Sequence, residues 1–330
     1  MLAVLCPGQG SQSPGMLSPW LELPGVADQL AAFGEAADLD LRVHGTESDA
    51  DTIRDTAVAQ PLIVSASLVA LRAILDGRDA TEVADVTAGH SVGEFAAAAV
   101  AGVFDDAGAV ALVAARARFM AEAAASTPSG MSAVLGGDAE EVLAAIESAG
   151  LWPANVNGGG QVVAAGSLDG LAALGTEPPT KARVIALQVA GAFHTPYMES
   201  ARQAFEPVAT TWAAQDPRLP YLSNADGLTY ADVSGATNGY GAAADVLARL
   251  AAQIAAPVRW DLCQASLAAL GVTGLLELAP GGVLTGLARR ALPGVETVAV
   301  KTPADLDKAR DLIARHSVAG GAPRTAETLA

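Results

Sequence analysis

Short apolar runs that end at glycine or proline alternate along the chain with longer runs of helical character. Residues 2–6 (LAVLC) form an apolar run that stops at Pro7 and Gly8, and residues 84–90 (ADVTAGH) form a second one. Runs of this length between turn residues are typical of buried strands. Residues 91–102 (SVGEFAAAAVAG) and 105–125 are compatible with helices, the second starting at Asp105 and Asp106. The alternation predicts an α/β fold.

From about residue 128 the pattern changes. Strands are predicted at 130–136 (GMSAVLG), at 160–167 (GQVVAAGS) and within 181–194 (KARVIALQVAGAFH), with short helices at 138–150 and 168–174. A β-α-β-β-α-β order over some 60 residues is the ferredoxin-like pattern. We therefore predict a discontinuous large α/β domain at 1–127 and 191–316, a ferredoxin-like small domain at 128–190, and a disordered tail at 317–330. Residues 275–292 (LLELAPGGVLTGLARRAL) predict a strand, a glycine-rich turn and a helix.

Composition and charge exclude several classes of function. The longest apolar run considered, residues 95–104 (FAAAAVAGVF), is too short to span a bilayer, which needs about 20 residues. The first ten residues lack the basic segment of a signal peptide. Two cysteines, Cys6 and Cys263, support neither a disulfide framework nor a metal site, which predicts a reducing, cytoplasmic setting. A net charge of −17 argues against nucleic-acid binding. We predict a monomer with no membrane attachment.

The stretch GHSVGEF (89–95) carries the strongest candidate chemistry. Gly89, Ser91 and Gly93 match G-x-S-x-G, which between a strand and a helix forms a nucleophile elbow and elsewhere is only a turn. A serine nucleophile needs a general base. Among the four histidines, His194 lies at the end of a predicted strand and is the best candidate. Neighbouring side chains on a tight turn are expected to diverge, which makes His90 a poor base for Ser91. The other two histidines lie in a loop-like stretch (His44) and near the end of the last predicted helix (His316).

Six motifs occur together in one order, and together they resemble a known enzyme family. They are PGQGSQ (7–12), GHSVGEF (89–95), AARARFM (114–120), PANVNGGGQVVAAG (153–166), GAFHTPYM (191–198) and PVRW (257–260). The chain is similar in these motifs to the malonyl-CoA:acyl carrier protein transacylases of type II fatty-acid synthesis. Acyltransferase domains of polyketide synthases share the order. The resemblance implies an α/β-hydrolase-like large domain with a ferredoxin-like insertion.

The implied reaction moves a malonyl group from malonyl-CoA to the phosphopantetheine thiol of acyl carrier protein through a malonyl-serine ester. No cofactor or metal is implied, since the coenzyme A thioester is itself the substrate. Ser91 would be the nucleophile and His194 the base, oriented by the backbone carbonyl of Gln253. The N–H groups of Gln9 and Val92 would form an oxyanion hole. A serine hydrolase and a non-catalytic carrier-protein docking module remain the alternatives.

Further residues take substrate roles from the same resemblance. Arg116 would pair with the malonyl carboxylate, with Arg118 as the alternative, and Phe193 would crowd the malonyl C2 atom and disfavour methylmalonyl. His90, Asn155 and Asn157 would lie near the substrate, although asparagines in PANVNGGGQ are also ordinary turn formers. An acidic carrier protein would dock on a local basic patch, for which the candidates are Lys181, Arg183, Arg289 and Arg290.

Overall fold

The computed structural model describes residues 1–234 and 238–318. Its strands are β1 (Leu2–Cys6), β2 (Val86–Gly89), β3 (Gly130–Gly136), β4 (Trp152–Gly158), β5 (Gln161–Gly166), β6 (Ala182–Ala186), β7 (Tyr221–Leu222), β8 (Val258–Arg259), β9 (Gly274–Glu277) and β10 (Glu296–Ala299). Its α-helices are α1 (Val26–Ala37), α2 (Leu41–Thr46), α3 (Thr56–Leu75), α4 (Gly93–Val100), α5 (Asp106–Ser126), α6 (Ala139–Ser148), α7 (Leu168–Thr176), α8 (Glu199–Thr210), α9 (Tyr230–Ser234), α10 (Ala243–Ala252), α11 (Trp260–Ala269), α12 (Val283–Ala291) and α13 (Leu306–His316).

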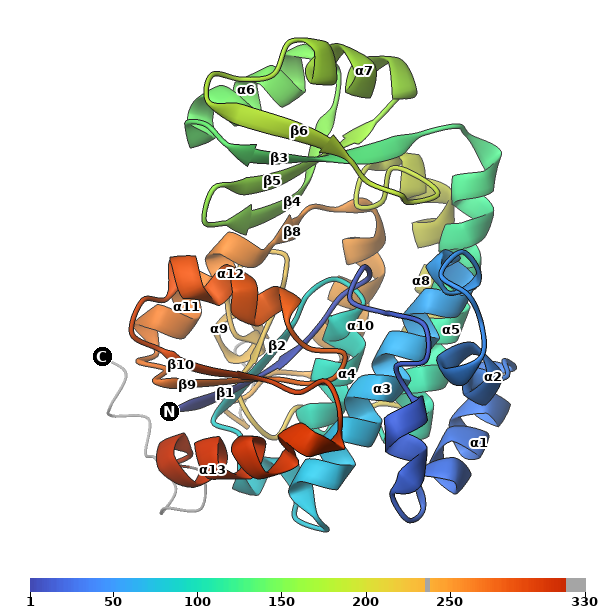
Figure 1. Cartoon of the computed structure of the whole chain (residues 1–330), viewed down its shortest axis with the longest axis vertical. Coiled ribbons are helices and arrows are strands. Elements are labelled where there is room, and N and C mark those ends of the chain that lie inside the picture. The colour runs from blue at the N-terminus through green and yellow to red at the C-terminus, as the bar shows by residue number, and fades with distance from the viewer. Residues whose placement is uncertain (235–237, 319–330) are drawn as a thin grey trace.

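The larger part of the molecule is built on a parallel sheet with helices on both faces (Figure 1). Its strand order is β10-β9-β1-β2-β7, with every neighbouring pair parallel. Leu2, Val4 and Cys6 of β1 join the core cluster formed with α3 and α4, whereas Ala3 and Leu5 join the cluster formed with α11 and α12. Because β1 is buried on both faces, its sequence is a continuous apolar run.

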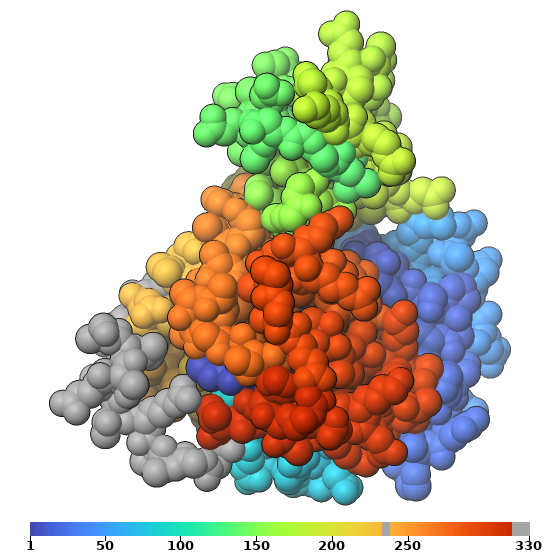
Figure 2. Space-filling view, turned by 60° about the vertical axis from the view of Figure 1, so that its left-hand side comes forward, coloured from blue at the N-terminus to red at the C-terminus, as the bar shows by residue number. Residues whose placement is uncertain are grey.

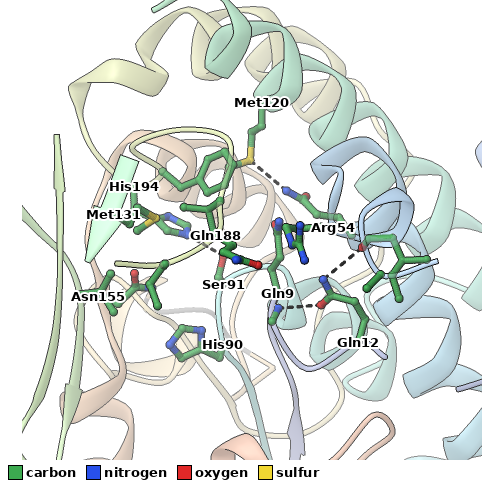
Figure 3. Close-up of a pocket in the computed structure, with 18 of the residues that line it drawn as sticks. Gln9, Gln12, Arg54, His90, Ser91, Met120, Met131, Asn155, Gln188 and His194 are labelled. Atoms are coloured by element: carbon green, nitrogen blue, oxygen red, sulfur yellow. Dashed lines mark hydrogen bonds between the residues drawn. The ribbon is translucent and has the colours of Figure 1, made fainter. Parts of the chain in front are cut away.

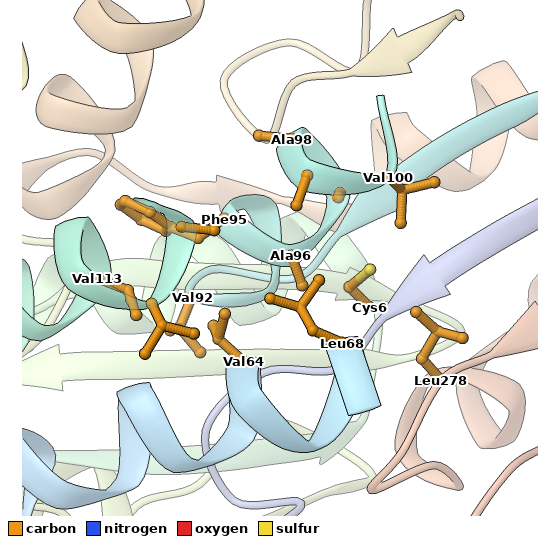
Figure 4. Packing of buried hydrophobic residues seen from close by; sticks show 14 of the residues in the cluster. Cys6, Val64, Leu68, Val92, Phe95, Ala96, Ala98, Val100, Val113 and Leu278 are labelled. Atoms are coloured by element: carbon orange, nitrogen blue, oxygen red, sulfur yellow. The ribbon is translucent and has the colours of Figure 1, made fainter. Parts of the chain in front are cut away.

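Helix α3 is the central helix of this core. It is apolar and long enough to cross a membrane by length and composition, a feature that the sequence analysis overlooked. In the structure, 83% of its most apolar window is buried within the protein. Figure 4 shows Val64 and Leu68 of α3 beneath Val92 and Ala96, at the start of α4. Its apolar character is therefore explained by packing between helices of the core.

The smaller part stands on the larger one, directly above the orange and red C-terminal segments (Figures 1 and 2). Its elements follow the order β3-α6-β4-β5-α7-β6, and the sheet order is β6-β3-β5-β4-β8. The four strands β3 to β6 pair antiparallel, while β8 comes from the larger part and pairs parallel with β4. The predicted fold class is confirmed, whereas the exact domain boundaries remain a prediction.

Two local predictions need correction, and the turn-former alternative for the asparagines of PANVNGGGQ does not hold. The strand predicted to lead into His194 ends at Ala186, where its pairing with β3 stops and the chain crosses back to the larger part. Asn155 and Asn157 lie within β4, where Asn155 pairs with Val163 of β5 and Asn157 lies at an irregularity in the pairing. His44 lies in the short helix α2, which Asp40 caps by accepting the N–H of Val43. Most of the predicted disordered tail, residues 319–330, lies outside the described residues.

Candidate active site

Ser91 occupies a tight turn between β2 and α4 with a left-handed backbone, φ +52°. The flanking glycines are required by space. A Cβ at Gly89 would lie 2.0 Å from the carbonyl carbon of Gly93, and a Cβ at Gly93 would lie 2.2 Å from the carbonyl oxygen of Cys6. Such short contacts force the backbone to shift, so the turn takes this shape only with glycine at both positions. The strand-turn-helix setting is that of a nucleophile elbow.

His194 meets Ser91 across the turn (Figure 3). The Nε2 atom of His194 lies 2.7 Å from Ser91 Oγ, and its Nδ1 atom lies 2.8 Å from the backbone carbonyl oxygen of Gln253. A carbonyl only accepts, so Nδ1 carries a proton and Nε2 of the neutral ring presents a lone pair to the serine. Burial and the nearby charge of Arg116 lower the pKa of His194 to about 3, so the ring is neutral near pH 7.

Two backbone N–H groups near Ser91 have no acceptor among the residues that the structure describes. They are those of Gln9, in the loop after β1, and Val92, which follows Ser91. Within residues 1–234 and 238–318, neither N–H donates a hydrogen bond. Gln9 lines the same pocket as Ser91, whereas the side chain of Val92 is buried in the core and leaves only its backbone available.

Ser91 opens into a pocket of about 380 Å³ between the two parts of the molecule. Predicted residues in its lining are Gln9, His90, Ser91, Asn155, Phe193 and His194. No sequence motif predicted the rest of the lining, which includes Gln12 and Arg54 on one wall and Met131 and Gln188 on the other (Figure 3). The pocket thus combines an apolar wall with several amide groups, as is typical of sites for small molecules.

Arg116 lies behind this lining with no exposed surface. Its Nη1 donates to Gln60 Oε1 at 2.5 Å, and its Nη2 donates to Gln253 Oε1 at 2.7 Å. In the described part of the chain, its Nε has no hydrogen-bond partner. Burial lowers the pKa of Arg116, and the charge of Glu94 opposes this shift. By contrast, Arg118 is exposed on the same helix.

His90 points away from Ser91, as predicted. Its Nε2 donates to Asn157 Oδ1 at 2.8 Å, and its ring packs against Trp260 with centroids 5.6 Å apart. Asn157 is therefore behind His90 and outside the pocket lining, whereas Asn155 lies in it.

Asn224 and Glu94 are parts of the site that sequence reasoning missed. Asn224 accepts the N–H of Ser91 at 2.7 Å through its side-chain oxygen and donates to the carbonyl of Gly89 at 2.7 Å. Asn224 follows β7, the sheet neighbour of β2. Asn224 and Ser91 therefore lie at the carboxyl ends of adjacent parallel strands. This placement could have identified Asn224 from the sequence, but β7 has only two residues and no recognisable strand pattern.

Comparisons with known proteins agree on one family. A family model described as "acyl transferase domain" matches residues 4–304. The malonyl CoA-acyl carrier protein transacylase of Mycobacterium tuberculosis is 51% identical over 94% of this chain and 100% of the relative. The crystal structure of MCAT from the same organism has a TM-score of 0.86 and covers 94% of this chain and 99% of that one.

A second solved structure is described as a type II PKS acyl-carrier protein in complex with its malonyl-transacylase. It has a TM-score of 0.82 at 28% identity, covering 94% of this chain and 99% of that chain. The family match spans far more than half of the sequence, and the relatives are matched over nearly their full length. The chain therefore belongs to the acyl transferase domain family.

Proposed function

We propose that this protein transfers a malonyl group from malonyl-CoA to the phosphopantetheine thiol of acyl carrier protein, through an ester on Ser91. The observation that carries the proposal is the chain Ser91 Oγ, His194 and the Gln253 carbonyl, with distances of 2.7 and 2.8 Å, at the pocket. The malonyl transacylase names of the relatives support the choice of acyl donor and acceptor.

In the first half-reaction, His194 Nε2 takes the proton of Ser91 as Oγ attacks the thioester carbonyl carbon. The negative charge that develops on the carbonyl oxygen would be stabilised by the N–H groups of Gln9 and Val92, which have no competing acceptor in the described residues. The carbon–sulfur bond then breaks, and His194 returns the proton to the departing coenzyme A sulfur. The product is malonyl-Ser91 and free coenzyme A.

The second half-reaction runs the same steps in reverse order with a new thiol. His194 takes the proton of the carrier-protein thiol as its sulfur attacks the ester carbonyl, and then gives that proton to the departing Ser91 Oγ. Because each substrate meets the site in turn, the kinetics are of the ping-pong type. The depressed pKa of His194 keeps the base neutral before each attack.

Arg116 supplies the proposed selectivity for malonyl. A guanidinium can hold a carboxylate with two parallel hydrogen bonds. In this protein its hydrogen-bond acceptors are neutral amide oxygens and its Nε has no hydrogen-bond partner within the described residues, so its charge is not cancelled by direct contact with a carboxylate. Gln60 both lines the pocket and accepts from Arg116 Nη1, so a shift of the Gln60 side chain would open a route from the pocket to the guanidinium.

The proposed route uses side chains and backbone groups alone, without cofactor or metal. We also propose that the protein acts as a cytoplasmic monomer that does not attach to membranes. The two cysteines, Cys6 and Cys263, are both free and buried, which supports a reducing compartment. The family's place in fatty-acid synthesis supports the same setting, and polyketide carrier proteins are a further proposed acceptor.

The test is a mass spectrum of the intact protein and its peptides after incubation with malonyl-CoA. We expect a malonyl adduct on the peptide that contains Ser91 and its loss in Ser91→Ala, with the fold retained. Ser148→Ala, at the exposed end of α6, serves as the matched control and should keep the adduct. Release of free malonate without transfer would indicate a hydrolase. No adduct and no turnover would indicate a docking module.

A further inference from the structure

We propose that Glu94 is a positioning residue that fixes the side-chain amide of Gln253 and, through it, holds Arg116 ready for the substrate carboxylate. This inference rests on the proposed malonyl transfer. It assigns to Glu94, a residue on the first turn of α4, a role in substrate selectivity beyond helix packing.

Glu94 is 1% exposed, and each of its carboxylate oxygens accepts from a different segment of the chain. Oε1 accepts the backbone N–H of Asn224 at 2.8 Å, and Oε2 accepts a hydrogen bond from Gln253 Nε2. Two N–H donors on two oxygens suit an ionised carboxylate, which only accepts. Burial raises the pKa of Glu94 to about 8, while these donors and the charge of Arg116 oppose the rise. The ionised form is assigned from the geometry, because a protonated oxygen would face an N–H donor that it cannot bind.

Gln253 can satisfy its surroundings in one amide orientation only. Its Nε2 faces two acceptors, Glu94 Oε2 and the carbonyl of Ser91 at 3.0 Å, and its Oε1 faces the donor Arg116 Nη2. Turning the amide over would set its oxygen against two acceptors and its NH₂ against the guanidinium. Amide orientation is determined by such partners. The carboxylate of Glu94 therefore sets which atom Arg116 meets.

The result is a buried arginine that is positioned but not neutralised by direct contact. An isolated buried charge is costly, so a negative charge nearby is needed for Arg116 to remain charged. Glu94 supplies that charge from beyond Gln253, so the amide lies between the carboxylate and the guanidinium. If Glu94 bound Arg116 directly, the substrate carboxylate would have to displace it. The intervening amide avoids this competition.

The same carboxylate also reaches the nucleophile. Glu94 holds the backbone of Asn224, whose side chain accepts the N–H of Ser91. Gln253 meanwhile presents its backbone carbonyl to His194. Glu94 thus contacts both residues that orient the reacting pair, although it lines no part of the pocket itself.

Glutamine cannot replace Glu94 in this arrangement. One end of its amide would be NH₂, and that end would face either the N–H of Asn224 or the NH₂ of Gln253. Relieving the second conflict requires Gln253 to turn over and lose its bonds to Ser91 and Arg116. In the Glu94→Gln variant, Asn224 and Gln253 therefore cannot both keep their bonds. This isosteric change is a sharp test.

The experiment compares kcat/KM for malonyl-CoA and acetyl-CoA in wild type and Glu94→Gln. We expect the malonyl-to-acetyl ratio to fall by about tenfold, because acetyl has no carboxylate to read. The matched control is Glu277→Gln. Glu277 is also fully buried, and its two oxygens accept the N–H groups of Leu284 and Thr285, at the start of α12. We expect this control to lower thermal stability without changing the ratio.

An unchanged ratio in Glu94→Gln, with both activities reduced alike, would overturn the proposal and leave Glu94 a structural residue. If Glu94→Gln does not fold, Gln253→Met removes the amide between Glu94 and Arg116 and leaves the backbone carbonyl that binds His194. Its ratio should fall in the same way, and an unchanged ratio there also overturns the proposal. Absence of a malonyl-Ser91 ester in wild type would instead refute the proposed function.

Discussion

Ser91 and His194 both have left-handed backbones, with φ of +52° and +61°. Outside glycine this conformation costs roughly 1–2 kcal/mol per residue and persists only where the surroundings enforce it. Asn224 accepts the N–H of Ser91, and the Gln253 carbonyl binds the ring of His194. These bonds hold Oγ and Nε2 in contact before any substrate arrives. At the scale of single residues, the site is preorganised by groups far away in the sequence.

The first prediction at this scale concerns how the rate of acyl-enzyme formation changes at acidic pH. Burial and the charges of Arg116 and His90 lower the pKa of His194 from 6.5 to about 3. The folded protein therefore keeps a neutral base well below pH 6.5. We expect kcat/KM for acyl-enzyme formation to show no loss near pH 6.5, measured by rapid quench between about pH 5 and 7. A tenfold decrease per pH unit below 6.5 would contradict this.

The same shift has a consequence for stability, with a definite sign. Since the pKa of His194 is lower in the folded than in the unfolded chain, its contribution to the free energy of unfolding is complete above pH 6.5. The contribution is lost as the pH falls from 6.5 toward 3, because the unfolded chain takes up the proton first.

Arg116→Ala tests whether Arg116 binds the carboxylate of the malonyl group. Breaking a desolvated charge pair costs roughly 2–5 kcal/mol, which corresponds to about 30-fold or more. We expect most malonyl transfer to be lost while acetyl transfer rises relative to it, as measured by the two specificity constants. Arg118→Ala is the control, since Arg118 is exposed on the same helix. Among the described residues, its side chain donates only to the carbonyl of Ala37, at 3.5 Å. An altered ratio in Arg118→Ala alone would move the role to that residue.

At the scale of elements, the nucleophile turn depends on close packing between β1, β2 and the start of α4. The end of β1 runs beside the turn, and the backbone carbonyl of Cys6 accepts the N–H of His90 at 3.0 Å. Gly93 faces that same carbonyl. The G-x-S-x-G pattern therefore encodes the approach of three elements as well as the exposure of a hydroxyl.

Gly93→Ala should destabilise the protein. Its Cβ would lie 2.2 Å from the Cys6 carbonyl oxygen, and overpacking of this kind costs roughly 1–3 kcal/mol. Thermal unfolding followed by circular dichroism measures the effect. Gly175→Ala, in helix α7, is the matched control because nothing lies within 4 Å of its added Cβ. That change should be neutral or stabilising by roughly 0.5–1 kcal/mol. Equal melting temperatures for both variants would contradict the packing argument.

Sequence patterns predicted those elements whose signals are local. The apolar run before Pro7, the G-x-S-x-G turn and the helix that Asp105 caps all appear as expected. His194 was found because the chain has only four histidines and because of the motif around it. Glu94 and Asn224 were not found, because their importance arises from a buried network that joins residues 130 positions apart. No local pattern records such a contact.

At the scale of the whole molecule, a net charge of −17 leaves few places where an acidic carrier protein could dock. Lys181, Arg183, Arg289 and Arg290 are exposed, and within the part that the structure describes none of them forms an ion pair. Arg290 lies against the β4–β5 turn, since a Cβ at Gly159 would be 3.2 Å from its Nε. On the other side of this turn, the carbonyl of Gly160 binds Gly136, which neighbours Lys181. The turn thus lies between the two pairs of cations.

Charge reversal at these four positions should raise KM for carrier protein several-fold and leave KM for malonyl-CoA unchanged. Rim charges act mainly on association and are screened by salt, so the difference should shrink at high ionic strength. Steady-state kinetics with each substrate varied in turn provide the measurement. Arg42→Glu, at another exposed arginine without an ion pair in the described residues, is the control. Equal losses for both substrates would exclude this surface as the docking site.

The pairing of β8 with β4 bears on how relatives could exchange parts. The two-residue strand Val258–Arg259 completes the small sheet, although it lies about 70 positions beyond β6 in the sequence. Its partner Asn155 lines the pocket. A chimera that imports residues 128–190 alone would set a foreign β4 against the resident β8 and displace the pocket wall. The part that can be exchanged between relatives is therefore discontinuous in sequence. A chimera has to carry residues 257–260 together with residues 128–190.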